Sequence, residues 1–279
     1  MALFGLPDPP SYTLSNAPLA QALAQVRFPL IAGFETMAGI APLQERLRPR
    51  FPYMEQVKTQ EIAFLTGPAG PAAGASESVS WNLTDDAGYT LAVNAGSATV
   101  SVGEAYTSVD DFIDALREVL VALADAGVPR SDRLGVRYLS LAPDLPGESG
   151  AWRRWFREEL VGWAGSSVLS TRSLVSSVTQ VHAIAAAVDD LSGPPGDVQA
   201  IVRHGFVPSG SVVPGIPPLD VGDPSYLLDV DVATVGHQDF DPDRLVEQFQ
   251  LFHSQVDRFF YWTLTEEGGH HFGLEERDG

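Results

Sequence analysis

Two segments of the chain carry an apolar stripe with helical spacing. In the first, Phe112, Leu116, Val119 and Leu123 repeat at intervals of four, three and four residues. This spacing places the four side chains on one face of a helix. Ser108 stands just before the stripe as a candidate N-terminal cap.

The second stripe lies near the C-terminal end, where Asp241 and Pro242 can cap and begin a helix. Its apolar residues have the same four-three-four spacing and are Leu245, Phe249, Phe252 and Val256. Upstream of the two stripes, the triplet Ala-Thr-Val occurs at 98–100 and again at 233–235. The match predicts an internal duplication of a strands-then-helix unit, although any two amphipathic helices would share this spacing.

Short apolar or alternating runs between turn residues predict strands. The expected strands are 23–28, 61–65, 80–84, 89–94, 98–102, 134–141, 174–188, 198–207 and 226–235. Further helices are expected at 39–50 and 152–163. Glycine, alanine and proline predict a mobile surface loop at 67–78, a turn at 192–196 and a long loop at 208–224.

This order of elements predicts an α+β fold, an antiparallel sheet with helices packed on one face. The duplication would divide it into two pseudo-repeated halves, each a β-meander plus a helix, at 15–142 and 151–267. Residues 1–14 are expected to form an N-terminal arm and residues 268–279 a flexible acidic tail.

The composition narrows the class of protein. Hydrophobic residues make up 44% of the 279, enough for a sizeable core. Seventeen basic against 36 acidic residues give a net charge of −19, which repels phosphate backbones and argues against general nucleic-acid binding. The same charge permits a basic protein partner.

Cysteine and targeting signals are absent from the sequence. Without cysteine there are no disulfides, thiolate metal sites or cysteine nucleophiles. No apolar run approaches the roughly 18–20 residues that span a bilayer, and no secretory signal is visible. We therefore expect a cytoplasmic protein without membrane association.

The common catalytic motifs are missing as well. The sequence has no nucleophile elbow, no phosphate-binding P-loop, no dinucleotide-binding glycine motif and no H-E-x-x-H. These absences predict no cofactor and favour a non-enzymatic protein, without excluding an enzyme.

Charged residues occur within several predicted strands. Asp229 and Asp231 are two positions apart and therefore leave the same face of their strand. They are weak candidates for an acid/base pair or a divalent-metal site, but no further metal ligand is evident. Arg27, Arg137 and Arg203 also lie in apolar strands, where an unpaired guanidinium is costly. We therefore predict a structural ion-pair network in which Arg137 and at least one of the other two arginines share a sheet face with these aspartates.

His253 lies one position past Phe252, on the flank of the second stripe. It is a weak candidate for a catalytic base, which would need an orienting carboxylate. The alternative is a helix-flank residue with a local partner.

A basic aromatic cluster stands out in the acidic chain, between residues 152 and 163. Helical spacing places Trp152, Trp155, Phe156, Leu160 and Trp163 on one broad face, which favours core packing. Interleaved arginines can face a protein partner, since tryptophan and arginine are enriched at interfaces. The candidate binding residues are Trp152, Arg153, Arg154 and Arg157.

Several short motifs together resemble a sporadically distributed family of bacterial and archaeal proteins of unknown function and similar length. They are Asn16-Ala-Pro-Leu19 before the strand Val26-Arg27-Phe28, Leu134-Gly-Val-Arg-Tyr138, Leu228-Asp-Val-Asp231, and Leu251-Phe-His253 with the helix from Phe259 to Thr265. The resemblance covers most of the chain. It implies no established activity, cofactor or catalytic residue.

Three functions follow as hypotheses. The first is a non-enzymatic protein that binds another protein, such as an antitoxin, immunity or defence component. The second is a small-molecule binder with a cavity between sheet and helices. The third is a metal-dependent hydrolase that uses Asp229 and Asp231. Self-association into a homo-oligomer is left open.

Overall fold

A single antiparallel sheet runs through both predicted halves of the chain. The computed structural model describes residues 3–67, 70–166, 174–185, 198–234 and 236–277. Within them the strand order is β3-β4-β5-β6-β2-β8-β13-β10-β9. The strands are β2 (Leu19–Arg27), β3 (Tyr53–Gly67), β4 (Gly70–Thr84), β5 (Tyr89–Asn94), β6 (Ser97–Val102), β8 (Arg133–Pro143), β9 (Ser177–Ala185), β10 (Val198–Val207) and β13 (Ser225–Thr234). Because β8 of the first predicted half pairs with β13 of the second, the boundary between the halves lies inside the sheet.

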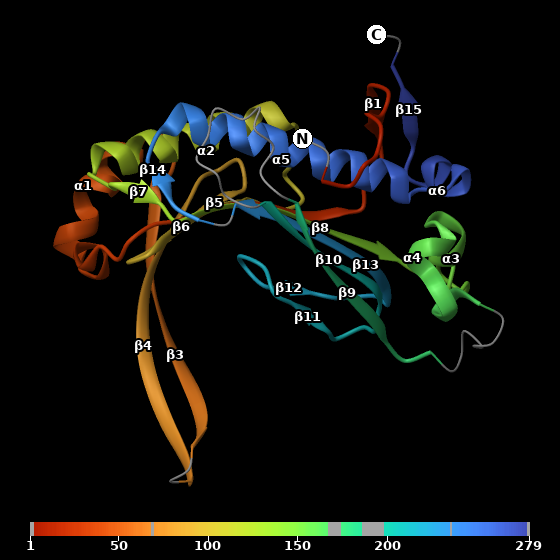
Figure 1. Cartoon of the computed structure of the whole chain (residues 1–279), viewed down its shortest axis with the longest axis horizontal. Helices are drawn as coiled ribbons and strands as arrows, with labels where there is room; N and C mark the ends of the chain where they lie inside the picture. Colours follow the sequence, from red (N-terminus) through yellow and green to blue (C-terminus); the bar gives the residue numbers. More distant parts are fainter. Residues whose placement is uncertain (1–2, 68–69, 167–173, 186–197, 235, 278–279) are drawn as a thin grey trace.

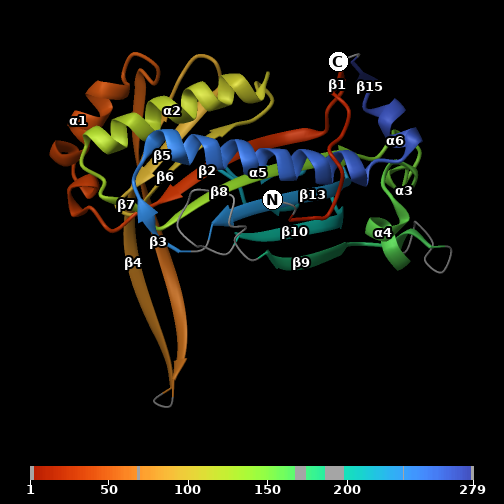
Figure 2. The ribbon, with the colours of Figure 1, turned by 45° about the horizontal axis from the view of Figure 1, so that its top comes forward.

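Two long helices, α2 (Val109–Asp125) and α5 (Pro242–Thr263), lie side by side on one face of this sheet (Figures 1 and 2). Both predicted apolar stripes are buried there. The rings of Phe112 and Phe249 stack across the two helices, with centroids 5.3 Å apart. The two stripes thus form the centre of the main core.

The predicted caps begin both helices. The side chain of Ser108 accepts a hydrogen bond from the backbone N–H of Asp111. That of Asp241 accepts from the N–H groups of Asp243 and Arg244. Each cap satisfies N–H groups that lack partners in the first turn of a helix.

The segment between β2 and β3 adds a further helix to the layer formed by α2 and α5. A 3-10 helix, η1 (Ala32–Glu35), leads into α1 (Met37–Leu47), and the buried side chains of α1 join the main core beside α2. The predicted fold class, α+β with helices on one face of an antiparallel sheet, is confirmed.

The internal duplication stays a prediction. In the strand order, β6 lies next to β2 and β13 lies next to β8, and these two pairs flank the β2–β8 contact. Each of β6 and β13 is followed by one of the long helices, α2 and α5. This topology is compatible with two related halves that divide before β8, whereas the predicted boundary places β8 in the first half.

The opposite face of the sheet carries a second, smaller core. The expected loop at 208–224 contains a short hairpin of β11 (Val212–Val213) and β12 (Leu219–Asp220), which lies over this face (Figure 1). The buried residues between the hairpin and the sheet are Leu23, Leu139, Val207, Val213, Val221 and Leu227. The hairpin is held by apolar contacts that the proline- and glycine-rich sequence did not reveal.

The prediction of a loop at 67–78 is wrong for residue 67 and residues 70–78, while residues 68 and 69 lie outside the described residues. Strands β3 and β4 form a long projecting hairpin (Figure 1), with paired positions continuing to Gly67 and Gly70. Strand pairing uses backbone N–H and C=O groups, so a run of small residues does not prevent it. Residue types alone had favoured a loop.

A continuous helix over 152–163 is also wrong. The chain forms α3 (Trp152–Trp155), α4 (Glu158–Val161) and a 3-10 turn, η2 (Gly162–Gly165). Phe156 is extended between the helices and bridges to Leu264. The N–H of Arg157 donates to the carbonyl of Thr263 at 2.9 Å. Hydrogen bonds to the end of α5 therefore replace those of a continuous helix.

The two ends of the chain pair with each other. Strand β1 (Tyr12–Leu14) of the N-terminal arm is antiparallel to β15 (Leu274–Glu276). Helix α6 (Glu266–His271) precedes β15, so the expected flexible tail is ordered over most of its length. The ring of His271 stacks on Trp155 with centroids 3.8 Å apart, and this packing anchors the tail.

A further short pair joins β7 (Arg130–Ser131) to β14 (Gln238–Asp239). The turn predicted at 192–196 lies outside the described residues. Among the helices that are described, none has the length and apolar character needed to cross a bilayer.

Candidate functional site

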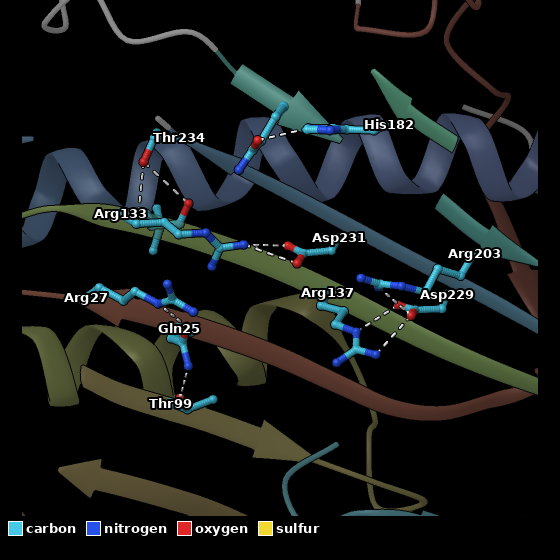
Figure 3. A network of polar contacts seen from close by, with 12 residues as sticks. Gln25, Arg27, Thr99, Arg133, Arg137, His182, Arg203, Asp229, Asp231 and Thr234 are labelled. Atoms are coloured by element: carbon cyan, nitrogen blue, oxygen red, sulfur yellow. Dashed lines mark hydrogen bonds and ion pairs between the residues drawn. The ribbon is translucent and has the colours of Figure 1, made fainter. Parts of the chain in front are cut away.

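Asp229 is the centre of an ion-pair network on the sheet face opposite the long helices (Figure 3). Its side chain is 1% exposed. Arg137 donates from Nε to Oδ1 at 2.7 Å and from Nη2 to Oδ2 at 2.9 Å. Arg203 donates from Nη1 to Oδ2 at 3.0 Å. This is the pairing that strand alternation predicts.

Asp231 has a different partner from the predicted ones. Arg133 donates from Nη2 to its two carboxylate oxygens, at 2.9 and 3.1 Å. Arg27 instead donates from Nε to Gln25 at 3.0 Å and bonds to neither aspartate. The side chain of Arg133 crosses over Gly135, where a Cβ atom would lie 2.1 Å from Nη1. A glycine two residues after a strand arginine is the signal that sequence analysis missed.

This geometry leaves little for a bound metal ion. All four carboxylate oxygens of Asp229 and Asp231 accept hydrogen bonds from guanidinium groups. In the described part of the chain, no three histidine, aspartate or glutamate side chains are grouped to hold an ion. The carboxylates that a metal-dependent hydrolase would use are thus already ion-paired.

The aromatic residues of the basic cluster belong mainly to the core. Trp152 and Trp155 are buried, and the ring of Trp152 stacks on Tyr226 at 5.0 Å. Phe156 stacks on the same tyrosine at 4.6 Å. Trp163 departs from the prediction, since it lies beyond the helix break and is 70% exposed.

The three arginines of the cluster bind groups of the same chain. Arg153 donates to the carbonyl of Ala164 at 2.8 Å. Arg154 forms ion pairs with Glu148 and Glu267 at opposite sides of its guanidinium. Arg157 donates to the carbonyl of Trp262. Use of these residues by a protein partner stays a prediction.

A cavity of about 750 Å³ lies between α5, β8 and the N-terminal arm. We call it the helix-face cavity, because the β8 residues that line it are on the side of the sheet that the helices cover. The lining polar and aromatic residues include Tyr12, Tyr106, Tyr138, Ser140, His253, Asp257 and Phe260. Its volume is within the range of small-molecule sites, about 300–1,000 Å³.

Three tyrosines line the helix-face cavity. The Tyr106 and Tyr138 hydroxyl oxygens are 3.5 Å apart. Tyr12, from the N-terminal arm, donates to Oδ1 of Asp257 at 2.6 Å. Burial raises the pKa of each of these tyrosines, so they stay neutral hydrogen-bond donors at neutral pH.

His253 lies on the cavity wall between aromatic rings. Its ring centroid is 5.4 Å from that of Tyr138 and 6.3 Å from that of Phe249. The Nδ1 atom is buried and has no hydrogen-bond partner among the described residues. Within the described part of the chain, Nδ1 therefore has no local hydrogen-bond partner, and the neighbours of the ring are the aromatic side chains of Tyr138 and Phe249.

The pKa of His253 is lowered by burial, an effect opposed by the nearby charges of Asp257 and Asp110. Because the unfolded chain then binds the proton more readily than the folded one, stability is complete above the ordinary pKa of 6.5 and is lost as the pH falls below it. We expect His253→Phe, which keeps an aromatic ring, to reduce the loss of unfolding free energy between about pH 6.5 and 5.5.

Urea unfolding at a series of pH values measures this effect. The exposed His270 provides the control variant, His270→Gln, which should keep the wild-type pH dependence. Burial also lowers the pKa of His204 and His271, so part of the acid loss should persist in His253→Phe. Identical slopes for wild type and His253→Phe would contradict the prediction.

Of the residues that line the helix-face cavity, sequence analysis singled out only His253 as a candidate functional residue. Asp257 follows it by four positions on α5, so the two side chains share a helix face, a signal that was available. The tyrosines come from the N-terminal arm, from β8 and from the segment before α2. Nothing in their sequence spacing indicates that they meet.

Comparison of the chain with models of known protein families, and with curated proteins, gave no match. The resemblance to the sporadically distributed bacterial and archaeal family therefore stays a prediction, and the function is argued from the geometry of the site.

Proposed function

We propose that this protein binds a small organic molecule in the helix-face cavity. The observation that supports the proposal is the convergence of Tyr106, Tyr138, His253 and Asp257 on one cavity of about 750 Å³. Concave sites with aromatic walls and a few polar groups are the usual form of small-molecule sites. The proposal corresponds to the second of the three hypotheses from the sequence.

The chemistry of the walls defines the class of ligand. Aromatic rings of Tyr106, Tyr138 and Phe260 offer apolar contacts and faces for a cation. Asp257 adds a carboxylate, while the tyrosines stay neutral because burial raises their pKa. The cavity therefore suits a neutral or cationic ligand with an aromatic or apolar part, and disfavours an anion.

Three probes of similar shape and different charge test this proposal. We expect benzylammonium and benzyl alcohol to perturb the NMR signals of Tyr106, Tyr138 and His253, and benzoate to perturb them less. The Tyr138→Phe variant keeps the ring but removes a hydroxyl donor, so its affinity for benzyl alcohol should fall several-fold, by about 0.5–1.5 kcal/mol.

The control variant is Tyr53→Phe, since Tyr53 is an exposed residue of β3 outside the cavity. It should bind all three probes as the wild type does. The absence of saturable binding for every probe, or perturbations confined to residues away from the cavity, would contradict the proposed function.

A protein partner is the second candidate function, and edge strand β9 favours it. Within the described sheet, β9 pairs only with β10. Its Val178 and Ile184 side chains share one face and are 52% and 65% exposed. Exposed apolar edge strands pair readily with another chain, and partner proteins use this surface for β-strand addition.

Co-purification from the native host tests this second function. The double variant Val178→Glu/Ile184→Glu should lose a stoichiometric partner that the wild type retains. Val212→Glu is the matched control, because Val212 is similarly exposed on the separate β11 hairpin. Recovery of no stoichiometric partner with the wild type, or equal loss in the control, would count against binding through β9.

A further inference from the structure

Two arginines face each other on the sheet without a carboxylate between them. In the register of β2 and β8, Arg27 lies directly opposite Arg133. Like charges at opposed positions of an antiparallel pair are destabilising. Figure 3 shows both side chains on neighbouring strands, with Arg137 further along β8. This arrangement needs a compensating negative charge.

The aspartates of the network supply only part of it. Asp231 pairs with Arg133 and Asp229 with Arg137 and Arg203, so two carboxylates share this face with four arginines, and Arg27 pairs with neither of them. A local excess of positive charge thus exists in a chain whose net charge is −19. Because the chain as a whole is acidic, this excess of positive charge is local to the arginine–aspartate face of the sheet.

A pocket of about 250 Å³ lies beside these arginines. We call it the arginine pocket; it is lined by Arg27, Arg133, Arg137, Thr99 and Asp231 together with residues 214–216 of the segment that carries the β11–β12 hairpin. It is on the sheet face opposite the helix-face cavity, since Arg133 and Arg137 alternate with the core-facing residues of β8.

Several donors at the arginine pocket are unused. Among the described residues, Arg27 bonds through Nε and Arg133 through Nη2. Arg137 uses Nε and Nη2 for Asp229. No hydrogen bond within the described part of the chain involves the remaining guanidinium nitrogens of these three residues, which are left to meet a ligand.

Two glycines allow close packing around the arginine pocket. A Cβ atom at Gly135 would lie 2.1 Å from Nη1 of Arg133, so only glycine allows this guanidinium to lie across β8. A Cβ atom at Gly215, in the covering segment, would lie 2.4 Å from Oε1 of Gln21. The position of Arg133 and the close approach of the covering segment therefore both depend on a glycine.

We propose that the arginine pocket binds the phosphate group of a small molecule. A phosphate monoester carries about −1.5 to −2 charges at pH 7 and several acceptor oxygens, which match the local excess charge and the unused donors. Arginine is well suited to phosphate because its planar fork donates two parallel hydrogen bonds. Asp231 also lines the pocket, but its carboxylate is held by Arg133.

Calorimetry at constant ionic strength tests the proposal with inorganic phosphate, sulfate and acetate. We expect saturable binding of phosphate and of sulfate, which has the same shape and a double charge, and much weaker binding of acetate. No saturable binding of phosphate, or acetate binding as tightly as phosphate, would overturn the proposal.

Arg27→Gln is the decisive variant, because Arg27 is exposed and bonds only to Gln25. Loss of a charge-assisted contact should weaken phosphate binding by about tenfold or more. The unliganded variant should unfold at the same urea concentration as the wild type or a higher one, since the repulsion from Arg133 is removed. The control is Arg46→Gln, at an exposed arginine paired with Asp125 on the far side of the sheet.

A second variant tests the arginine pocket without leaving an unpaired charge in the fold. The double variant Arg133→Gln/Asp231→Asn removes a whole ion pair and should bind phosphate at least tenfold more weakly while remaining folded. Unchanged affinity in Arg27→Gln, or an equal loss in Arg46→Gln, would overturn the proposal. These results are independent of the helix-face cavity, which lies on the opposite face and is tested with benzylammonium, benzyl alcohol and benzoate.

Discussion

Replacing Asp229 with alanine is expected to lower the free energy of unfolding by about 3–5 kcal/mol. The carboxylate is 1% exposed, and it neutralises two guanidinium groups that are themselves only 21% and 32% exposed, those of Arg137 and Arg203. Removing the acid leaves two cations, one on β8 and one on β10, without their ion-pair partner. Urea unfolding followed by tryptophan fluorescence measures the loss.

Asp231 provides the matched control for this prediction. It lies two residues along the same strand, but its side chain is 19% exposed and it binds one arginine rather than two. Asp231→Ala should therefore cost less, about 1–2 kcal/mol. Equal losses for the two variants would show that burial and the second arginine do not govern the stability of the network.

Phe249→Ala is expected to produce the other large loss, again about 3–5 kcal/mol. Phe249 is fully buried on α5, and its ring stacks on that of Phe112 from α2 at 5.3 Å and an interplanar angle of 11°. Truncation leaves a cavity at the contact between the two long helices, which the surrounding sheet and helices cannot close without moving. Urea unfolding is again the measurement.

Phe259→Ala serves as the control on the same helix. Phe259 is only partly buried and packs against Phe4 of the N-terminal arm, so its loss should be clearly smaller. A double-mutant cycle between Phe112 and Phe249 should give a coupling of about 0.5–1.5 kcal/mol. No measurable coupling would contradict a specific role for the stacked rings.

The alternation of side chains along a strand predicted some of the arginine–aspartate pairs but not others. The pairing of Asp229 with Arg137 and Arg203 was predictable because the side-chain period of a strand is two, and the apolar neighbours identify the core face. The pairing of Asp231 with Arg133 was not, since Asp231 lies opposite Arg137 and Arg133 reaches it from four residues away along β8, over Gly135. A contact with this offset depends on the strand register and on the absence of a side chain at Gly135.

The helix-face cavity was predicted only as a general type of site. Its residues meet because the N-terminal arm crosses to α5, so that Tyr12 bonds to Asp257, 245 positions away in the chain. The β1–β15 pair holds the two ends in this position. Neither contact leaves a periodic signal in the sequence.

The amino-acid sequence by itself determined the two amphipathic helices with their caps, most strands of the sheet and the α+β class. These features depend on local periodicity and on capping residues, whose effects extend over only a few neighbouring positions. The tertiary structure alone decided the break after Trp155, the order of the C-terminal tail and the residues that meet at the two proposed binding sites. In each case hydrogen bonds or packing with distant segments outweighed local preference, because burial and satisfied polar groups contribute more free energy than intrinsic propensity.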